Sequence, residues 1–407
     1  MGSLCYSELG TLIPKSGGDY SYVRDAFGDL LAFVYIWVSI LLVRPSSLAI
    51  MSLTFGTYFA AVFDLCGSPQ IFERLAAVAC LLTVMLLNCY SVKLSSWATV
   101  ISTLFKIGSL LVIVVGGFIK MAQGNTAVLA TGFQGSTQDP TTVSLAFYDA
   151  LWAYDGWVNL NTVTEELQKP SKNLPRANIG GVALVILIYL ATNIAYFTVM
   201  TTTEMLDADA VAVLWGDRVL KQASVLIPIT VMISTFGAVN ATAFAGGRPV
   251  FAAARDGNLP SIFSYIHANK LTPLPSMVFT ICLAIVYVFL GSIYSLIDFF
   301  SFTAWFFYGM NFVALLVFRV TKPHDKRPYK CPIFIPILMV LISLYLIIAP
   351  IIKEPSMGYL YAAIFTAGSV IVYFPLVKFK FELPFADKLT TYIQLVLQVV
   401  PASKYVD

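Results

Sequence analysis

Apolar segments long enough to cross a membrane alternate with short polar connections along the whole chain. A membrane-spanning helix needs roughly 20 mostly apolar residues, so the pattern predicts a series of full spans. The predicted spans are residues 27–62, 73–92, 97–121, 143–164, 177–201, 223–246, 274–292, 295–319, 333–352 and 358–378. Residues 1–13 add an apolar piece that is half a span at most. The pattern therefore predicts an all-α polytopic membrane protein.

Composition indicates that lipid, rather than water, surrounds most of the chain. Of the 407 residues, 58% are hydrophobic and only 12% are charged, whereas an average soluble domain carries about 25% charged residues. These values exclude a cytosolic enzyme, a disordered scaffold and a nucleic-acid-binding protein. The net charge of +3 is too small to indicate an anionic polymer as partner. Two histidines, and six cysteines without a CxxC pair, offer no metal or redox motif, so neither metal nor cofactor is expected.

Basic residues divide unevenly between the two sets of alternate loops and ends. One set, with the loop near Lys15 and the C-terminus, holds 18 Lys and Arg residues, and the other holds 5. The positive-inside rule makes the first set cytoplasmic and puts the loops near Cys66 and Asp209 outside. Residues 380–407 are then a cytoplasmic tail. Its residues 390–400 are weakly amphipathic and either lie on the inner leaflet or contact the protein's own loops.

A polar interruption inside the span at residues 143–164 is the clearest candidate site. Asp155 and Gly156 stand near its middle, with two asparagines following. Gly156 weakens the helix, and a carboxylate in lipid requires a partner. Broken helices in membranes expose N–H and C=O groups that bind substrates at mid-depth. Three aromatic residues cluster at the break: Trp152, Tyr154 and Trp157. A binding site is favoured over the plainer reading, a glycine kink with a hydrogen-bonded aspartate.

Two further polar features lie inside predicted spans. Lys106 is about ten residues, or roughly 15 Å, from the inner end of its span, too far for easy snorkelling. It must pair, face a polar cavity or lose its proton. After Arg44, Pro45 removes a backbone donor and disturbs the helix. Ser46 and Ser47 either bond back to the backbone or face a pathway, and these two readings are equally weighted.

Two runs, one of small residues and one of aromatic residues, are interpreted mainly as packing surfaces. Residues 237–247 are small and suit close helix packing, with Asn240 and Thr242 as candidates to reach a cavity. Residues 299–308 are rich in aromatic side chains, most of which are expected to pack against lipid or neighbouring helices. One or two of them are candidates to wall off an apolar substrate side chain.

Several motifs, in order, resemble one family of membrane proteins. They include CYSELGTLIPKSGGDYSYV (5–23), LLVRPSS (41–47), NCYSVK (88–93), GWVNLNTVTEELQKPSKNLPRA (156–177), FGAVNATAFAGGR (236–248) and FFSFTAW (299–305). The sequence resembles the light subunits of heteromeric amino-acid transporters, the L-type family of the amino acid–polyamine–organocation superfamily. The resemblance runs nearly from end to end. LWAYDGW (151–157) resembles most the exchanger light chains for cystine, dibasic and neutral amino acids.

The resemblance implies roles for residues around the break. Trp152 matches an aromatic gate over the bound amino acid, and carbonyls around Ala153 and Asp155 match those that accept its ammonium group. Asp155 matches the partner of a cationic side chain. Lys106 resembles the lysine that occupies a sodium site in sodium-independent members. Further matching pathway and pocket positions are Ser46, Ser47, Tyr196, Ala238 and Thr242.

The resemblance also implies a partner and an architecture. Cys66 matches the cysteine that forms a disulfide with a single-pass glycoprotein heavy subunit, and an outer loop is an oxidising location. Residues 1–379 are expected to form one transporter domain with an inverted-repeat fold, five plus five helices plus two. Family members carry a Gly-Ser-Gly motif on a broken first helix, which binds the substrate carboxylate. No such motif is present, and Met1 matches a position inside the family's second span. The chain is therefore expected to lack the first helix and most of the second.

The resemblance implies sodium-independent exchange of cationic amino acids and cystine for neutral ones across the plasma membrane. Two alternatives stay open: a truncated, non-transporting adaptor of the heavy subunit, and an exchanger of large neutral amino acids. An integral-membrane enzyme is not expected, because the sequence offers no metal cluster and no nucleophile–base set.

Overall fold

The computed structural model describes residues 1–15, 17–63, 70–208, 210–270, 272–353, 355, 357–379 and 386–401. Their architecture is helical, as the apolar pattern predicted, with one small two-stranded sheet. In the first part of the chain the elements are α1 (Gly2–Leu12), α2 (Asp19–Phe27), α3 (Asp29–Val38), the π-helical segment η1 (Ser39–Val43), α4 (Arg44–Phe63), α5 (Gln70–Tyr90), α6 (Val92–Ala122) and α7 (Ala127–Ala130).

The second part contains the interrupted helix and the remaining long helices. Its elements are α8 (Pro140–Trp152), the 3-10 helix η2 (Asp155–Glu166), α9 (Pro170–Phe197), α10 (Thr202–Asp207), α11 (Val211–Val219), η3 (Lys221–Ala223), α12 (Leu226–Arg255), η4 (Ser261–Ser264), β1 (Tyr265–His267), α13 (Leu274–Leu290), α14 (Ile293–Thr321), α15 (Phe334–Lys353), α16 (Met357–Tyr373), η5 (Phe374–Lys378), α17 (Ala386–Leu397) and β2 (Val399–Pro401).

Eight helical segments of the described chain are long and apolar enough to cross a membrane. Two of the predicted spans are absent from this set. The span at 143–164 is divided between α8 and η2, and the span at 274–292 is the 17-residue helix α13. Leu187 and Ile371 leave much of their apolar surface exposed. Water would oppose that exposure, so these outward faces fit a lipid surrounding.

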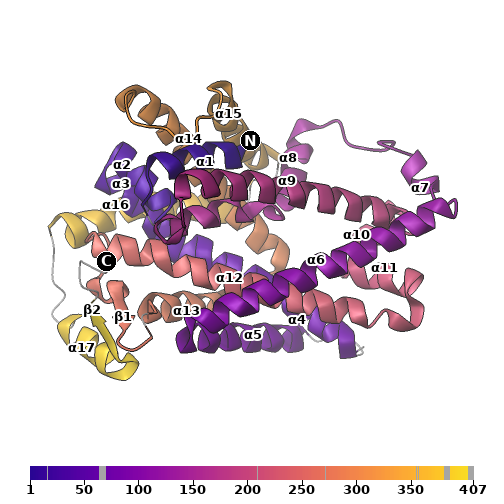
Figure 1. Cartoon of the computed structure of the whole chain (residues 1–407), viewed down its shortest axis with the longest axis horizontal. Coiled ribbons are helices and arrows are strands. Elements are labelled where there is room, and N and C mark those ends of the chain that lie inside the picture. The colour runs from indigo at the N-terminus through magenta and orange to yellow at the C-terminus, as the bar shows by residue number, and fades with distance from the viewer. Residues whose placement is uncertain are drawn as a thin grey trace.

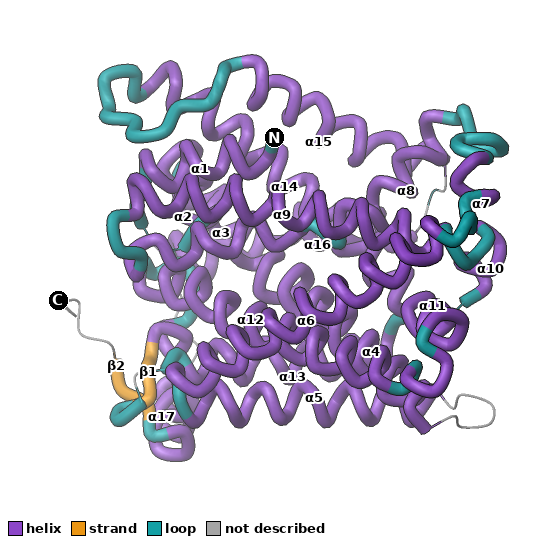
Figure 2. The backbone as a smooth tube through the Cα atoms, turned by 45° about the vertical axis from the view of Figure 1, so that its right-hand side comes forward, coloured by secondary structure: helices purple, strands orange, loops and turns teal. Residues whose placement is uncertain are grey.

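The long helices pack side by side and run between two differently built ends (Figures 1 and 2). One end carries the sheet and α17, and the other carries the short helices α7, α10 and α11. Small residues allow the close helix contacts. A Cβ on Gly237 of α12 would lie 2.2 Å from the Ser102 Cβ of α6, and one on Gly117 would lie 2.2 Å from the Ala195 Cβ. The predicted packing face at 237–247 is therefore confirmed at Gly237.

The helix that carries Arg44 bends where the sequence places Pro45. The π-helical segment η1 directly precedes Arg44. Pro45 has no N–H to bond the Leu41 carbonyl four residues earlier, and the Tyr287 hydroxyl donates to that oxygen instead, at 3.2 Å. Ser46 donates back to the Leu42 carbonyl at 2.7 Å. The backbone groups freed at Pro45 are therefore satisfied within the protein.

The tail folds back on the protein's own loops, which was one of its two predicted alternatives. β2 pairs antiparallel with β1, with Tyr265 opposite Pro401 and His267 opposite Val399. Val399 is buried and packs with Ile262 and Leu274. This contact ties the end of the described chain to the connection between α12 and α13.

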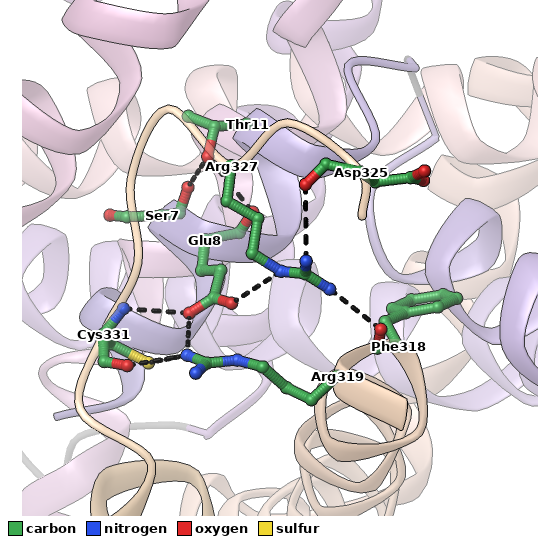
Figure 3. Close-up of polar contacts among 8 residues, drawn as sticks. All are labelled: Ser7, Glu8, Thr11, Phe318, Arg319, Asp325, Arg327 and Cys331. Atoms are coloured by element: carbon green, nitrogen blue, oxygen red, sulfur yellow. Dashed lines mark hydrogen bonds and ion pairs between the residues drawn. The ribbon is translucent and has the colours of Figure 1, made fainter. Parts of the chain in front are cut away.

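A buried ion cluster joins α1 to the end of α14 (Figure 3). Glu8 has no exposed surface. Its carboxylate accepts hydrogen bonds from Arg319 Nη2 at 2.5 Å and from the Cys331 backbone N–H at 2.9 Å. Arg327 Nε lies 3.3 Å from the other carboxylate oxygen. Figure 3 shows the two guanidinium groups on different sides of Glu8. The cluster therefore anchors α14, which also carries side chains of the candidate site.

Candidate functional site

The predicted break in the span at 143–164 is confirmed. The α-helix α8 ends at Trp152, a turn follows at Ala153 and Tyr154, and the chain continues from Asp155 as a 3-10 helix. Twelve residues of 3-10 helix is a long run for this geometry, and Val163 departs from helical angles within it. The regular ladder of hydrogen bonds is therefore interrupted beside Asp155, deep in the helical bundle.

A cavity of about 370 Å³ lies at this break. Its walls come from the break itself, from α2, α3, η1 and α4, and from α6, α9, α12 and α14. Ala153 and Gly156 are exposed in its wall. A Cβ on Gly156 would meet no protein atom within 4 Å. Glycine here therefore leaves the cavity open and makes no close contact with a neighbouring helix.

Asp155 is held in the cavity wall by a tyrosine from another helix. The Tyr308 hydroxyl of α14 donates to Asp155 Oδ1 at 2.5 Å. The ring of Tyr308 lies 5.2 Å from Trp157 and 5.7 Å from Trp305, centroid to centroid. These contacts fix the hydroxyl, and the hydroxyl in turn fixes one carboxylate oxygen. The carboxylate itself lines the cavity.

Charged groups of both signs line the same cavity. Arg44 and Lys106 are the cations, and Asp19 and Asp155 are the acids. Arg44 Nη1 lies 3.4 Å from the Asn159 side-chain oxygen, a long contact that joins the start of α4 to η2. Opposite charges in one enclosed space lower the cost of burying each of them. The arrangement suits a zwitterion or a cation better than a purely apolar ligand.

Aromatic side chains close one side of the cavity. The rings of Trp152 and Phe300 meet edge to face with centroids 4.6 Å apart, and both line the cavity. Phe307 and the small side chain of Ala304 continue this wall along α14. A few residues of the aromatic run at 299–308 therefore do face a cavity, as the sequence suggested for one or two of them.

A second cavity, of about 480 Å³, adjoins the first and is lined mainly by apolar side chains. Trp152, Asp155 and Tyr308 line both cavities. The Asp155–Tyr308 pair therefore belongs to the wall between a charged space and an apolar one.

The structure brings together most of the residues singled out from the sequence. Those that line the charged cavity are Ser47, Lys106, Trp152, Ala153, Asp155, Ala238 and Thr242. Ser46 is buried and its hydroxyl donates to the backbone of its own helix, which was one of the two predicted alternatives. Ser47 lines the cavity, which was the other. Tyr196 does not line this cavity and packs beside Trp215 and Tyr58. Cys66 lies outside the described residues.

The asparagines near the break have different positions. Asn159 faces the cavity. Asn161 is fully buried and donates to the Tyr6 carbonyl at 2.8 Å and to the Tyr22 hydroxyl at 2.9 Å, while Asn178 donates to its oxygen. Asn161 is therefore a structural residue that holds η2 against α1, α2 and α9.

The charged or polar cavity residues that were not identified as site residues from the sequence include Asp19, Arg44 and Tyr308. Arg44 was visible as a charge inside a span, a signal that points to function by itself. Tyr308 was hidden in an aromatic run, and Asp19 precedes the first long apolar span. Nothing local in the sequence distinguishes either of them from a surface or packing residue.

Similarity to known proteins agrees with this geometry. Residues 1–374 match the amino acid permease family. The chain is 44% identical over 407 residues to the b(0,+)-type amino acid transporter 1 of Mus musculus, covering 99% of this chain and 84% of that protein. It is 37% identical over 404 residues to the human cystine/glutamate transporter, covering 98% and 81%. It is 39% identical over 381 residues to the mouse large neutral amino acids transporter small subunit 2, covering 92% and 71%. The chain therefore belongs to the amino acid permease family, among the light subunits of heteromeric amino-acid transporters, and is a transporter rather than an enzyme.

Proposed function

We propose that this protein exchanges amino acids across the plasma membrane without sodium, taking up cationic amino acids and cystine against neutral ones. The observation that carries the proposal is the position of Asp155. It stands where a membrane helix is interrupted, and it lines a cavity of both charges. An acidic group there is a suitable partner for the charged end of lysine, arginine or ornithine.

In this proposal, different groups in the cavity wall bind different parts of the substrate. Backbone carbonyls near Ala153 and Asp155 accept the substrate ammonium group, because the interrupted helix leaves such groups without a regular ladder. The Asp155 carboxylate, oriented by Tyr308, receives a cationic side chain. Neutral side chains rest against the aromatic wall of Trp152 and Phe300 instead. One cavity thereby accommodates both classes of substrate, as an exchanger requires.

Lys106 provides the basis for sodium independence in this proposal. Its amino group belongs to the protein and lines the cavity. A lysine there takes the electrostatic role that a bound metal ion has in other transporters. The transporter then needs no sodium gradient to bind its substrate.

The proposal also includes a partner and an orientation. A glycoprotein heavy subunit is joined through a disulfide at Cys66, in line with the "small subunit" in the name of one relative. The 18-to-5 division of basic residues between alternate loops supports a cytoplasmic C-terminus. In this orientation α10 and α11 face outward, and the sheet with α17 faces the cytoplasm.

Exchange by the purified protein tests the proposal. The chain is reconstituted with its heavy subunit into vesicles loaded with unlabelled leucine, and uptake of radiolabelled lysine is followed in sodium chloride and in choline chloride. We expect uptake that depends on internal leucine and is equal in both salts. Folded protein that inserts into vesicles and yet shows no uptake would contradict exchange and leave the non-transporting adaptor as the better reading.

A further inference from the structure

A second carboxylate, from a different part of the chain, lines the same cavity as Asp155. Asp19 is the first residue of α2 and follows Gly17 and Gly18, both of which have positive φ angles. A Cβ on Gly18 would lie 3.2 Å from the Thr162 methyl group. The glycines therefore let this turn lie close against η2. The turn thus brings Asp19 to the cavity from the Thr162 side of the break.

The Asp19 carboxylate is buried but only partly satisfied. The residue is 7% exposed. Its Oδ2 accepts a long hydrogen bond of 3.4 Å from the Tyr35 hydroxyl, its Oδ1 is buried, and the Tyr6 hydroxyl is a further donor beside the carboxylate. A buried carboxylate whose nearest donors are neutral hydroxyl groups keeps an uncompensated charge, which favours a cation beside it in the functional state.

The protein's own cations lie near Asp19 but form no close ion pair with it among the described residues. Arg44 lines the same cavity, and its Nη1 is directed at the Asn159 oxygen at 3.4 Å. Lys106 lines the cavity from α6. Neither of them forms an ion pair of 4 Å or less with Asp19 in the part of the chain that the structure describes. Asp19 is therefore a carboxylate at the cavity wall with room for an external cation.

We propose that Asp19 is a second acidic contact for the cationic side chain of the substrate. This inference rests on the proposed exchange of cationic amino acids. Asp19 and Asp155 line the same cavity of about 370 Å³, and each carboxylate accepts a hydrogen bond from a tyrosine hydroxyl in its wall. The two carboxylates therefore face one substrate in a shared cavity, Asp155 from the break and Asp19 from the start of α2.

A purely structural role for Asp19 makes a different prediction. An acidic residue in the first turn of a helix stabilises that turn through the helix dipole, typically by about 0.3–1 kcal/mol. Loss of that effect would lower the thermal stability of the protein. It would change the KM values for lysine and leucine by the same factor. Substrate discrimination therefore separates the two roles.

The test compares Asp19→Asn, Asp19→Glu and the wild type, each with its heavy subunit in vesicles. Asp25→Asn is the matched control. Asp25 lies on the same helix, and its carboxylate pairs with Lys15 at 3.3 Å, outside the cavity. Apparent KM values for lysine and for leucine are measured, along with the melting temperature of each purified variant.

We expect Asp19→Asn to raise the KM for lysine roughly 5-fold, as for a partly solvated charge pair, and to change that for leucine less than twofold. Asp19→Glu should restore most of the lysine affinity, and Asp25→Asn should behave as the wild type. Two results would overturn this inference but leave the proposed function intact. One is an equal change in the KM values for lysine and leucine in Asp19→Asn, and the other is a lower melting temperature with an unchanged lysine KM. Wild-type protein that transports neither amino acid would overturn the proposed function, and this inference with it.

Discussion

At the scale of single residues, the site depends on one hydrogen bond between two parts of the chain that are far apart in sequence. Tyr308 donates to Asp155 Oδ1 at 2.5 Å, and its ring is fixed by contacts with Trp157 and Trp305. A hydrogen bond to a charged acceptor contributes about 1.5–3 kcal/mol. The orientation of Asp155, and not only its charge, is therefore expected to determine how well a cationic side chain binds.

Removal of this hydroxyl tests the orienting role. Tyr308→Phe keeps the ring in place and frees the carboxylate, so we expect the KM for lysine to rise roughly 10-fold with little change for leucine. Uptake into vesicles at a series of substrate concentrations measures both values. Tyr392→Phe, on the exposed face of α17, is the control. A proportional loss for both amino acids would mean that Tyr308 serves packing only.

At the scale of elements, α14 is anchored at one end by the buried Glu8 cluster and carries Tyr308 in its middle. Breaking a buried ion pair by removing one partner leaves an uncompensated charge and costs about 3–5 kcal/mol. Glu8 faces two guanidinium groups, Arg319 and Arg327. The position of α14 against α1 is therefore expected to depend strongly on this single carboxylate.

The Glu8 cluster can be tested by thermal unfolding of the purified protein. Glu8→Ala should lower the free energy of unfolding by about 3 kcal/mol or more, because Arg319 and Arg327 lose their buried partner. Asp25→Ala removes a surface pair with Lys15 and should cost about 0–1 kcal/mol. Similar melting temperatures for the two variants would show that the cluster does not stabilise α14.

The loop helix α10 offers an element whose stability depends on pH. Thr201 and Glu204 form a capping box, and Arg218 pairs with the Glu204 carboxylate through two nitrogens, at 3.0 Å and 2.5 Å. The Arg218 hydrogen bond, with further bonds from Thr201, lowers the pKa of Glu204 from 4.5 to about 2. A lowered pKa in the folded state contributes stability above pH 4.5 that is lost as the pH falls toward 2.

We therefore expect the amides of α10 to exchange hydrogen faster, relative to intrinsic rates, as the pH falls below about 4.5. Hydrogen exchange followed by mass spectrometry measures this directly. The Glu204→Gln variant should exchange fast at neutral pH and show no further change on acidification. Protection of α10 that stays constant from pH 7 to pH 3 would contradict the assignment.

At the scale of the whole molecule, hydropathy predicts the bundle well because the lipid-facing helices are continuous apolar runs. It fails where a helix is short or interrupted. The run at 274–292 has enough apolar residues for a span but forms a helix of 17 residues, and the run at 143–164 changes geometry at Asp155. Length and apolar content alone do not distinguish an intact span from a broken one.

The site was predictable where it is local and hidden where it is assembled by packing. Asp155, Gly156 and Trp152 are neighbours in sequence, so the break and its carboxylate could be recognised together. Asp19 and Tyr308 reach the cavity only because α2 and α14 pack beside η2. The spacing of apolar residues along the sequence does not predict which helices pack together. The hydroxyls of Ser46 and Ser47 diverge because adjacent residues on a helix point in directions about 100° apart.

The central claim is that a carboxylate at the broken helix recognises the positive charge of the substrate. The most direct measurement is the ratio of lysine to leucine transport by Asp155→Ala, with its heavy subunit in vesicles, compared with the wild type. The account predicts a lysine KM raised at least about 10-fold and a leucine KM within twofold of the wild type. Equal losses for the two amino acids, in protein that melts at the wild-type temperature, would contradict it.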